Sequence, residues 1–195
     1  VPDPKSIYQQ IYKLQPGHCM TCSARGIPTR EYWDVSFARP AAGSSEDIAG
    51  TLYSLLEESV DMRMISDVPL GAFLSGGVDS SAVVAMMARA DRRPSITTSI
   101  GFEEARYNEL PWARRVAERY RTDHHEHIVR ADAVDVVETL AWHYDEPFAD
   151  YSAVPTYYVS KAAREHVTVS LSGDGGDENF GGYRRYRFDL RERQL

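Results

Sequence analysis

The chain has 195 residues, of which 43% are hydrophobic and 26% charged, and its formal net charge is −7. This composition excludes a disordered tail, and the acidic balance speaks against a nucleic-acid partner, because surfaces that bind nucleic acid are usually basic. No apolar run reaches the length of a membrane span, and no basic-then-apolar leader opens the sequence. We therefore expect a cytoplasmic protein without a membrane partner. The length fits one domain, or one domain plus a piece of another.

The first forty residues are rich in Pro, Gly and Tyr and contain two short apolar stretches, Ile7–Leu14 and Glu31–Phe37. This pattern is typical of strands joined by turns. Cys19 and Cys22 form a single C-x-x-C. A zinc site would need a second pair of ligands, so we interpret them as two reduced thiols, with a redox pair or an intermolecular metal site as alternatives.

From residue 41 onward, apolar strands alternate with amphipathic helices. The linker 41–47 closes with the start of a helix. Ser44 or Ser45 can cap this helix, whose apolar residues continue to Val60. The elements expected next are a strand at Val68–Leu74, a helix at Ser81–Ala90, a strand at Ile96–Phe102, a helix at Glu109–Arg121, a strand at His125–Val129, helices at Asp132–His143 and Pro155–Arg164, and a strand at Val167–Leu171. Strands joined by helices predict an α/β fold, in which a parallel twisted sheet carries helices on both faces.

A glycine-rich loop, LSGGVDSS, follows the first of these strands. Gly76 and Gly77 can take positive φ and leave room for an anion to approach the backbone amides. The following helix adds its free N–H groups, so the loop predicts a site for phosphate or pyrophosphate. Asp79 would repel a phosphate unless a cation lay between them, which indicates Mg²⁺ bound together with a nucleotide. The loop matches neither the Walker A motif nor the Rossmann fingerprint, and a plain strand-to-helix turn is the alternative.

A second loop, LSGDGGDE, follows the last strand. In a parallel sheet, loops at the C-terminal ends of strands can face each other across one crevice. We therefore predict that Asp177 is the second ligand of the Mg²⁺ that Asp79 holds. A calcium-type acidic loop or a plain turn is the alternative, although the acid spacing does not match an EF-hand.

Three further groups have weaker signals. His125 and His127 would share one face of a strand beside His124, a spacing compatible with a metal, but we interpret the cluster as structural. His143 most simply ends a helix, with an acid–base pair as the alternative. The arginine-rich tail YRRYRFDLRERQL is interpreted as a solvated helix face, with a grip on phosphate or RNA as the alternative.

Five ordered motifs support a family assignment: SGGVDSS, IGFEEARYNE, TDHHEH, DEPFADYSAVPTYY and LSGDGGDENFGGYRRY. The first resembles the pyrophosphate-binding loop of the PP-loop ATP pyrophosphatases, and together they resemble the synthetase domain of glutamine-hydrolysing asparagine synthetases. The resemblance implies a Rossmann-like fold of the adenine nucleotide alpha hydrolase type for residues 41–195. It also implies that residues 1–40 are the C-terminal remnant of a β-rich glutaminase domain.

The resemblance implies a reaction as well. A substrate carboxylate, aspartate in the family, attacks ATP to give an acyl-adenylate and pyrophosphate, and ammonia from glutamine then forms the amide. ATP, Mg²⁺, the carboxylate and ammonia are thus the implied partners, and a homodimer is compatible with it. The residues carried over for pyrophosphate are Ser75, Gly76, Gly77, Asp79, Ser80 and Ser81. Those carried over for the adenosine pocket are Leu74, Ile100, Ser172 and Gly173. Asp79 and Asp177 are carried over as metal ligands.

Two departures qualify the implied function. Asp174 stands beside the expected acyl-adenylate, where asparagine synthetases often carry glutamate, so the acceptor could be a carboxylate other than aspartate. The sequence starts with Val1, where a glutaminase nucleophile would be cysteine, and it stops inside a predicted helix. We therefore expect an incomplete chain that is inactive alone. The open alternatives are a related amidotransferase or β-lactam-forming ligase, a transfer-RNA-modifying PP-loop enzyme, and a nucleotide-sensing module without catalysis.

Overall fold

A computed structural model of the chain describes residues 1–36, 41–91, 93–104, 108–130 and 133–192. The contacts divide the chain into two compact units, Val1–Ile48 with Asp132–Ala153 and Ala49–Ala131 with Val154–Leu195. The boundary predicted at residue 40 lies outside the described residues and stays a prediction. So do residues 105–107 of the IGFEEARYNE motif and residues 193–195 of the tail.

The first unit contains a small antiparallel hairpin, β1 (His18–Met20) with β2 (Thr29–Glu31), and helix α4 (Ala133–Tyr144). An ion pair joins the N-terminal segment of this unit to the residues after α4: Lys13 Nζ lies 2.5 Å from Glu146 Oε1. The apolar stretch Ile7–Leu14 contributes no strand to this hairpin. Residues 7–10 form bends and turns, and Tyr12 makes only an isolated antiparallel bridge with Lys5. Ser6 Oγ donates to the carbonyl oxygen of Ile11 at 2.7 Å and so satisfies an acceptor that a strand would use.

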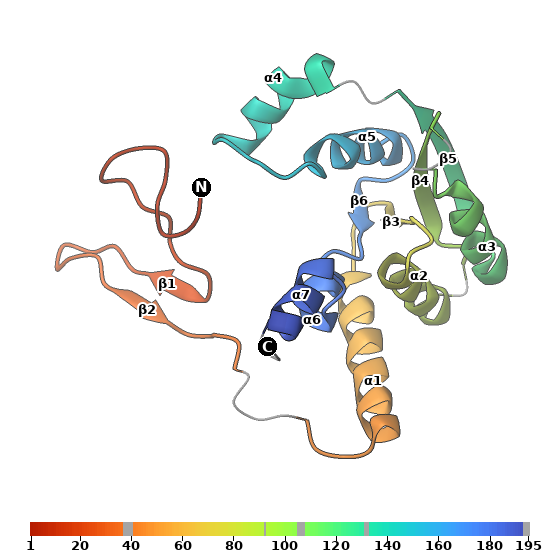
Figure 1. Cartoon of the computed structure of the whole chain (residues 1–195), viewed down its shortest axis with the longest axis horizontal. Coiled ribbons are helices and arrows are strands. Elements are labelled where there is room, and N and C mark those ends of the chain that lie inside the picture. Colours follow the sequence, from red (N-terminus) through yellow and green to blue (C-terminus); the bar gives the residue numbers. More distant parts are fainter. Residues whose placement is uncertain (37–40, 92, 105–107, 131–132, 193–195) are drawn as a thin grey trace. The chain divides into compact units, whose positions relative to one another are not determined.

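The second unit alternates strands and helices in chain order, and Figure 1 shows their arrangement. Its elements are α1 (Ser45–Arg63), β3 (Leu70–Phe73), α2 (Val78–Ala90), β4 (Ile96–Phe102), α3 (Leu110–Tyr120), β5 (Asp123–Val129), α5 (Ala153–Ala163), β6 (Val169–Leu171), α6 (Gly176–Phe180) and α7 (Arg184–Glu192). Ser44 caps α1, since its Oγ accepts from the Asp47 amide at 3.2 Å while Asp47 Oδ2 accepts from the Ser44 amide at 3.0 Å. None of the described helices combines the length and the apolar character that crossing a membrane requires.

The four strands β5-β4-β3-β6 form one sheet in that order, and every neighbouring pair is parallel. The chain moves outward from β3 to β4 and β5, and then returns to the other side of β3 to form β6. The order of the strands therefore reverses between β3 and β6. Such a switch point leaves a crevice outside the C-terminal ends of the two strands, which is where open α/β sheets bind ligands.

Helices cover both faces of the sheet, which confirms the predicted α/β class. On one face, Ala72 and Leu74 pack with Val84 of α2 and Ala113 of α3, in a core that also contains Val60 of α1. Side chains alternate along a strand, so Phe73 and the residues level with it point to the opposite face. There, His125 of β5 stacks on His166, which follows α5.

Several predicted boundaries shift in the structure: β3 starts two residues later than predicted, at Leu70, and α5 starts two residues earlier, at Ala153. Helix α2 begins at Val78 rather than Ser81, because the extended Gly77 is its N-cap and the Gly77 carbonyl accepts from the Ser81 amide at 3.1 Å. Strand β5 begins at Asp123 rather than His125, since all seven of its residues pair with β4. Strand β6 starts two residues later than predicted, at Val169. The earlier start of α2 places Asp79 in the opening turn of a helix.

Candidate nucleotide-binding site

The loop after β3 is fixed by its own serines. The Ser75 amide donates to Ser80 Oγ at 3.2 Å, the two hydroxyls lie 2.9 Å apart, and the Gly77 amide donates to Ser75 Oγ at 3.2 Å. Ser80 is buried, with 8% of its surface exposed. These bonds close a tight turn between β3 and α2, in which Asp79 projects from the first turn of the helix.

Gly76 is the residue that lets this turn pack against the rest of the fold. Its φ is +81°, and a Cβ added there would lie 2.5 Å from the backbone nitrogen of Ala113 in α3. A side chain at this position would therefore strain the backbone and collide with main-chain atoms. The first glycine of the pair thus places the loop, and it is not among the residues that line the two cavities described below.

The loop after β6 has a looser hydrogen-bond network. Ser172 Oγ donates to Asp174 Oδ2 at 3.0 Å, and the Gly176 amide donates to the Gly173 carbonyl at 3.2 Å, just before α6 begins. Asn179 Nδ2 donates back to the Gly175 carbonyl at 2.6 Å. Asp174 and Asp177 are exposed, in contrast with the buried Ser80 of the first loop.

The two loops are in direct contact across the switch point. A Cβ added to Gly173 would lie 2.7 Å from the Ser80 amide nitrogen, and one added to Gly176 would lie 2.5 Å from Asp79 Oδ2. Glycine at these positions lets the second loop pass close over the start of α2. The Asp79 carboxylate therefore lies against the backbone of the second loop, at a glycine that leaves room for it.

Two neighbouring cavities open at this contact, and both are in the size range of small-molecule sites. The smaller has a volume of about 380 Å³ and is lined by Phe73, Ser75, Gly77, Val78, Asp79, Ser80, Thr156, Ser172, Gly173, Asp174 and Asp177. The larger, of about 570 Å³, includes Leu56, Ser59, Val60, Arg63, Asn179 and Phe180. Asp79, Ser172, Gly173 and Asp174 line both. Asp79 and Asp174 thus form part of the wall that the cavities share, while Asp177 lines the smaller one alone.

The smaller cavity has the donor chemistry of a magnesium site. Three carboxylates, from Asp79, Asp174 and Asp177, line it together with serine hydroxyls. Mg²⁺ prefers one or two carboxylates plus phosphate oxygens and water, so this set fits the ion that the sequence predicts. Gly182 leaves space beside Asp177, because a Cβ added at Gly182 would collide with the Asp177 carboxylate.

Glu178, the last acid of the second loop, is engaged elsewhere. Tyr183 Oη donates to Glu178 Oε1 at 2.6 Å. This hydrogen bond lowers the pKa of the Glu178 carboxyl and raises the pKa of Tyr183 to about 12. Glu178 therefore links α6 to the start of α7, and it is not among the residues that line either cavity.

Four residues carried over from the resemblance lie away from the two cavities. Leu74 is 1% exposed and belongs to the core, with its amide bound to the Thr98 carbonyl at 3.0 Å. Ser81 Oγ is buried and has no hydrogen-bond partner among the described residues. Ile100 is half-buried on β4, opposite His127. With Gly76, these residues are not in the walls of either cavity, and their predicted roles stay predictions.

Sequence reasoning missed other lining residues. Thr156 of α5 reaches the smaller cavity, and Ser59 and Arg63 of α1 reach the larger one. Thr156 belongs to a motif quoted for the family resemblance, so a signal existed, but no residue in that motif was given a role. Ser59 and Arg63 have no such signal, since they lie on a helix that was predicted only from its apolar spacing.

The histidine cluster of β5 divides between the two faces of the sheet. His124 faces α3, where one ring nitrogen lies 2.8 Å from Thr97 Oγ1, and burial lowers its pKa. His125 and His127 lie on the other face, as their spacing predicts.

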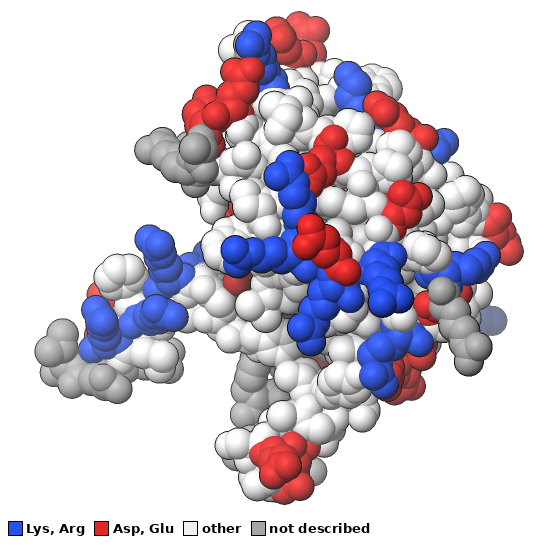
Figure 2. Space-filling view, turned by 90° about the vertical axis from the view of Figure 1, so that its right-hand side faces the viewer, with Lys and Arg blue, Asp and Glu red and all other residues white. Residues whose placement is uncertain are grey.

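Figure 2 shows basic and acidic side chains mixed over one face of the molecule. Several charged side chains are paired, such as Arg114 with Glu126, whose closest nitrogen and oxygen lie 2.6 Å apart.

Comparison with known proteins identifies the family of the chain. The family model for asparagine synthase matches residues 51–195. The chain belongs to the asparagine synthase family. It is 43% identical over 198 residues to a protein named asparagine synthetase (glutamine-hydrolyzing) 2 from Methanocaldococcus jannaschii, covering 97% of this chain and 38% of that protein. It is 35% identical over 193 residues to asparagine synthetase (glutamine-hydrolyzing) 1 of Bacillus subtilis, covering 97% of this chain and 30% of that protein.

A more distant relative carries a different name. The chain is 29% identical over 210 residues to the amidase chry2 of Gibberella zeae, covering 96% of this chain and 31% of that protein. The chain thus spans roughly a third of each of these relatives, and its similarity to them runs through almost all of its own length.

Proposed function

We propose that this chain provides the ATP-binding synthetase domain of a ligase that converts aspartate to asparagine. In the proposed reaction, a carboxylate oxygen of the substrate attacks the α-phosphorus of ATP, and the bond to the bridging oxygen of the β-phosphate breaks. Pyrophosphate leaves with that electron pair, and an acyl-adenylate remains. Ammonia derived from glutamine then attacks the acyl carbon, AMP leaves, and a proton lost from the nitrogen completes the amide.

The observation that carries the proposal is the meeting of the two loops at the switch point of the sheet. A leaving pyrophosphate gains charge as its bond breaks, so donors already fixed around it stabilise the transition state more than the ground state. The loop after β3 offers such donors at the start of α2, and its serines hold it in one shape. Its cavity is also large enough to take a polar ligand.

Asp79 and Asp177 are the proposed ligands of Mg²⁺, with Asp174 on the same wall. When bound, the ion supplies Lewis-acid neutralisation of the phosphate oxygens. Without a cation, these carboxylates would repel the phosphates of the nucleotide. Their position beside the loop therefore supports a bound cation. Ser172 holds Asp174 through its hydroxyl, which orients that carboxylate toward the common wall.

Two observations favour a second candidate for the acceptor. Asp174, which the resemblance places beside the acyl-adenylate, is shorter by one methylene than the glutamate often found in asparagine synthetases. One relative of this chain is named an amidase rather than an asparagine synthetase. The second candidate is therefore a related amide-forming ligase that activates a different carboxylate at the same site.

Pyrophosphate release by the complete protein, measured with ATP, Mg²⁺ and a panel of carboxylates, tests the proposal. We expect release that depends on aspartate, and that exceeds release with glutamate, β-alanine or N-acyl amino acids. Greater release with another member of the panel would support the second candidate. No carboxylate-dependent release with any member, from a protein that binds ATP, would contradict both.

A further inference from the structure

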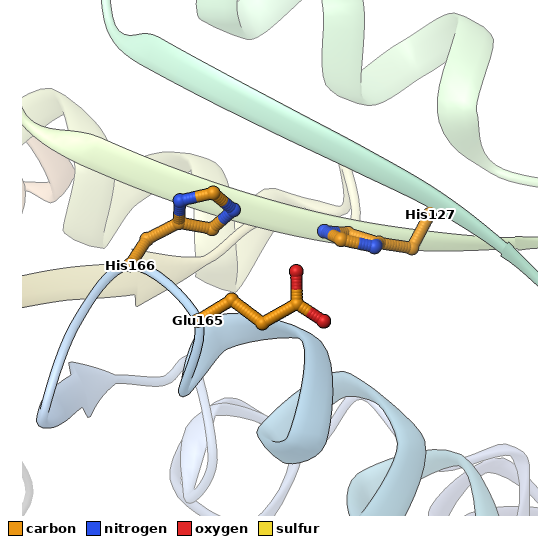
Figure 3. A group of neighbouring side chains, drawn as sticks. All are labelled: His127, Glu165 and His166. Atoms are coloured by element: carbon orange, nitrogen blue, oxygen red, sulfur yellow. The ribbon is translucent and has the colours of Figure 1, made fainter.

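Away from the two loops, three potential metal ligands converge on the face of the sheet that is opposite α2 and α3. His127 projects from β5, and Glu165 and His166 project from the turn that follows α5 (Figure 3). One ring nitrogen of each histidine and one carboxylate oxygen of Glu165 lie within 4.8 Å of one another. Ligands that each lie about 2.1 Å from a shared ion are at most about 4.2 Å apart, so small side-chain rotations would close the site.

The backbone beneath these side chains is well fixed. His127 belongs to β5, which is paired with β4 along its whole length. The amides of Glu165 and His166 donate to the carbonyls of Ala162 and Ala163, at 3.2 and 2.9 Å. Both alanines are buried, with 4% and 3% of their surfaces exposed. The turn is therefore seated on the protein interior rather than projecting freely into solvent.

A further histidine supports the orientation of the ligands. The rings of His125 and His166 are stacked, with centroids 3.6 Å apart and an interplanar angle of 14°. His125 is held in turn by Asp123, whose Oδ1 lies 3.3 Å from His125 Nε2. Stacking fixes the plane of the His166 ring, which reduces the conformational entropy that metal binding would have to overcome.

We propose that His127, Glu165 and His166 form a binding site for a first-row divalent transition metal, of which Zn²⁺ is the favoured example. Two imidazoles and one carboxylate suit Zn²⁺, Co²⁺ or Ni²⁺, whereas Mg²⁺ prefers an all-oxygen set. Glu165 is exposed and both histidines are half-buried, so solvent can complete the coordination. The site is distinct from the proposed Mg²⁺ site in both donor type and position, since none of its residues lines either cavity.

The expected role of this metal is structural. It would tie strand β5, at the edge of the described sheet, to the turn between α5 and β6. The loop that carries Asp174 and Asp177 begins directly after β6. A metal that binds the folded but not the unfolded chain raises stability by mass action, so Zn²⁺ should raise the midpoint of thermal unfolding.

The test measures binding of Zn²⁺ by calorimetry and of Co²⁺ by absorbance, on the complete protein in a Cys19→Ser/Cys22→Ser background. Millimolar Mg²⁺ is present throughout to fill the acidic site between the loops. We expect stoichiometric Zn²⁺ binding and a rise in the unfolding midpoint. His127→Gln, His166→Gln and Glu165→Gln should each weaken Zn²⁺ binding by at least about tenfold and remove most of that rise.

His143→Gln is the matched control, because it removes an exposed histidine of α4 and should leave Zn²⁺ binding unchanged. If a histidine variant unfolds, Glu165→Gln decides the question, since Glu165 is exposed and its loss should not disturb the fold. Zn²⁺ binding of unchanged affinity in Glu165→Gln and in whichever histidine variants fold would overturn the proposal, as would the absence of stoichiometric binding in the parent. Neither result would bear on pyrophosphate release.

Discussion

The two glycine-rich loops at the switch point have similar compositions but are held in different ways. The loop after β3 is locked by bonds between Ser75, Gly77 and Ser80, and Gly76 seats it on α3. The loop after β6 has exposed acids, and its closest approaches are to the first loop rather than to the core. This difference indicates a division of tasks. The first loop is part of the fold and presents fixed donors, while the second brings carboxylates to it.

The division predicts that the same substitution has different consequences in the two loops. Glycine to alanine adds a single methyl group, so any contrast reports on what surrounds that methyl. At Gly76 in the first loop the neighbour is the main chain of α3, which cannot move without disturbing the core. At Gly176 in the second loop the neighbour is the Asp79 carboxylate, which can move but would then leave its position in the site.

The largest effect on stability is expected for Gly76→Ala. The left-handed φ and the collision with Ala113 should together lower the free energy of unfolding by about 2–4 kcal/mol. Urea unfolding followed by circular dichroism measures this change. Gly50→Ala is the matched control, because Gly50 lies in α1 with no atom within 4 Å of an added Cβ. The control should be stabilised by about 0.5–1 kcal/mol, since alanine favours the helix.

Gly176→Ala should act on the chemistry instead. Its Cβ would displace the Asp79 carboxylate, and a displacement near 1 Å at a catalytic site can slow a reaction by about 10–100-fold. We expect carboxylate-dependent pyrophosphate release to fall by that factor, while the free energy of unfolding changes by less than about 1 kcal/mol. A variant that loses stability as severely as Gly76→Ala, or one that keeps full activity, would remove the distinction between the loops.

A smaller contrast is expected between Ser80→Ala and Ser172→Ala. Ser80 Oγ accepts from the Ser75 amide inside the first loop, so its removal leaves a part-buried donor unpaired and should cost about 1–2 kcal/mol. Ser172 bonds only to the exposed Asp174 among the partners described, and its removal should cost less than about 0.5 kcal/mol. Equal losses in the two variants, measured by urea unfolding, would mean that both loops are equally part of the fold.

Much of the fold was predictable because the sequence signals are local. The sequence predicts strand β4 to the residue, since five of its seven positions are apolar or β-branched and Pro94 lies just before it. The parallel arrangement follows from the alternation of strands and helices, and the close approaches of Gly173 and Gly176 to Ser80 and Asp79 confirm that the two glycine-rich loops face each other. The sequence predicts the start of α2 three residues too late, because the extended Gly77 that serves as its N-cap carries no side-chain capping group.

Contacts between distant segments were beyond sequence reasoning. Ser59 and Arg63 reach the larger cavity from a helix whose apolar spacing gives no hint of a ligand. The approach of His166 to His127 and His125 depends on how α5 lies against the sheet, and no motif encodes that contact. The role that the resemblance implies for Leu74 stays a prediction, and its side chain is part of the core.

The central claim, that acids from both loops hold one ion, is tested most directly by Asp79→Asn, Asp177→Asn and the double variant. The assay is carboxylate-dependent pyrophosphate release by the complete protein across a range of Mg²⁺ concentrations, with Asp61→Asn, an exposed residue of α1, as the control. Each single variant should slow release by about 10²–10³-fold and raise the Mg²⁺ requirement. If both acids serve one ion, the double variant should be little slower than either single variant. Losses that multiply, or a Mg²⁺ requirement unchanged in either single variant, would contradict a shared ion.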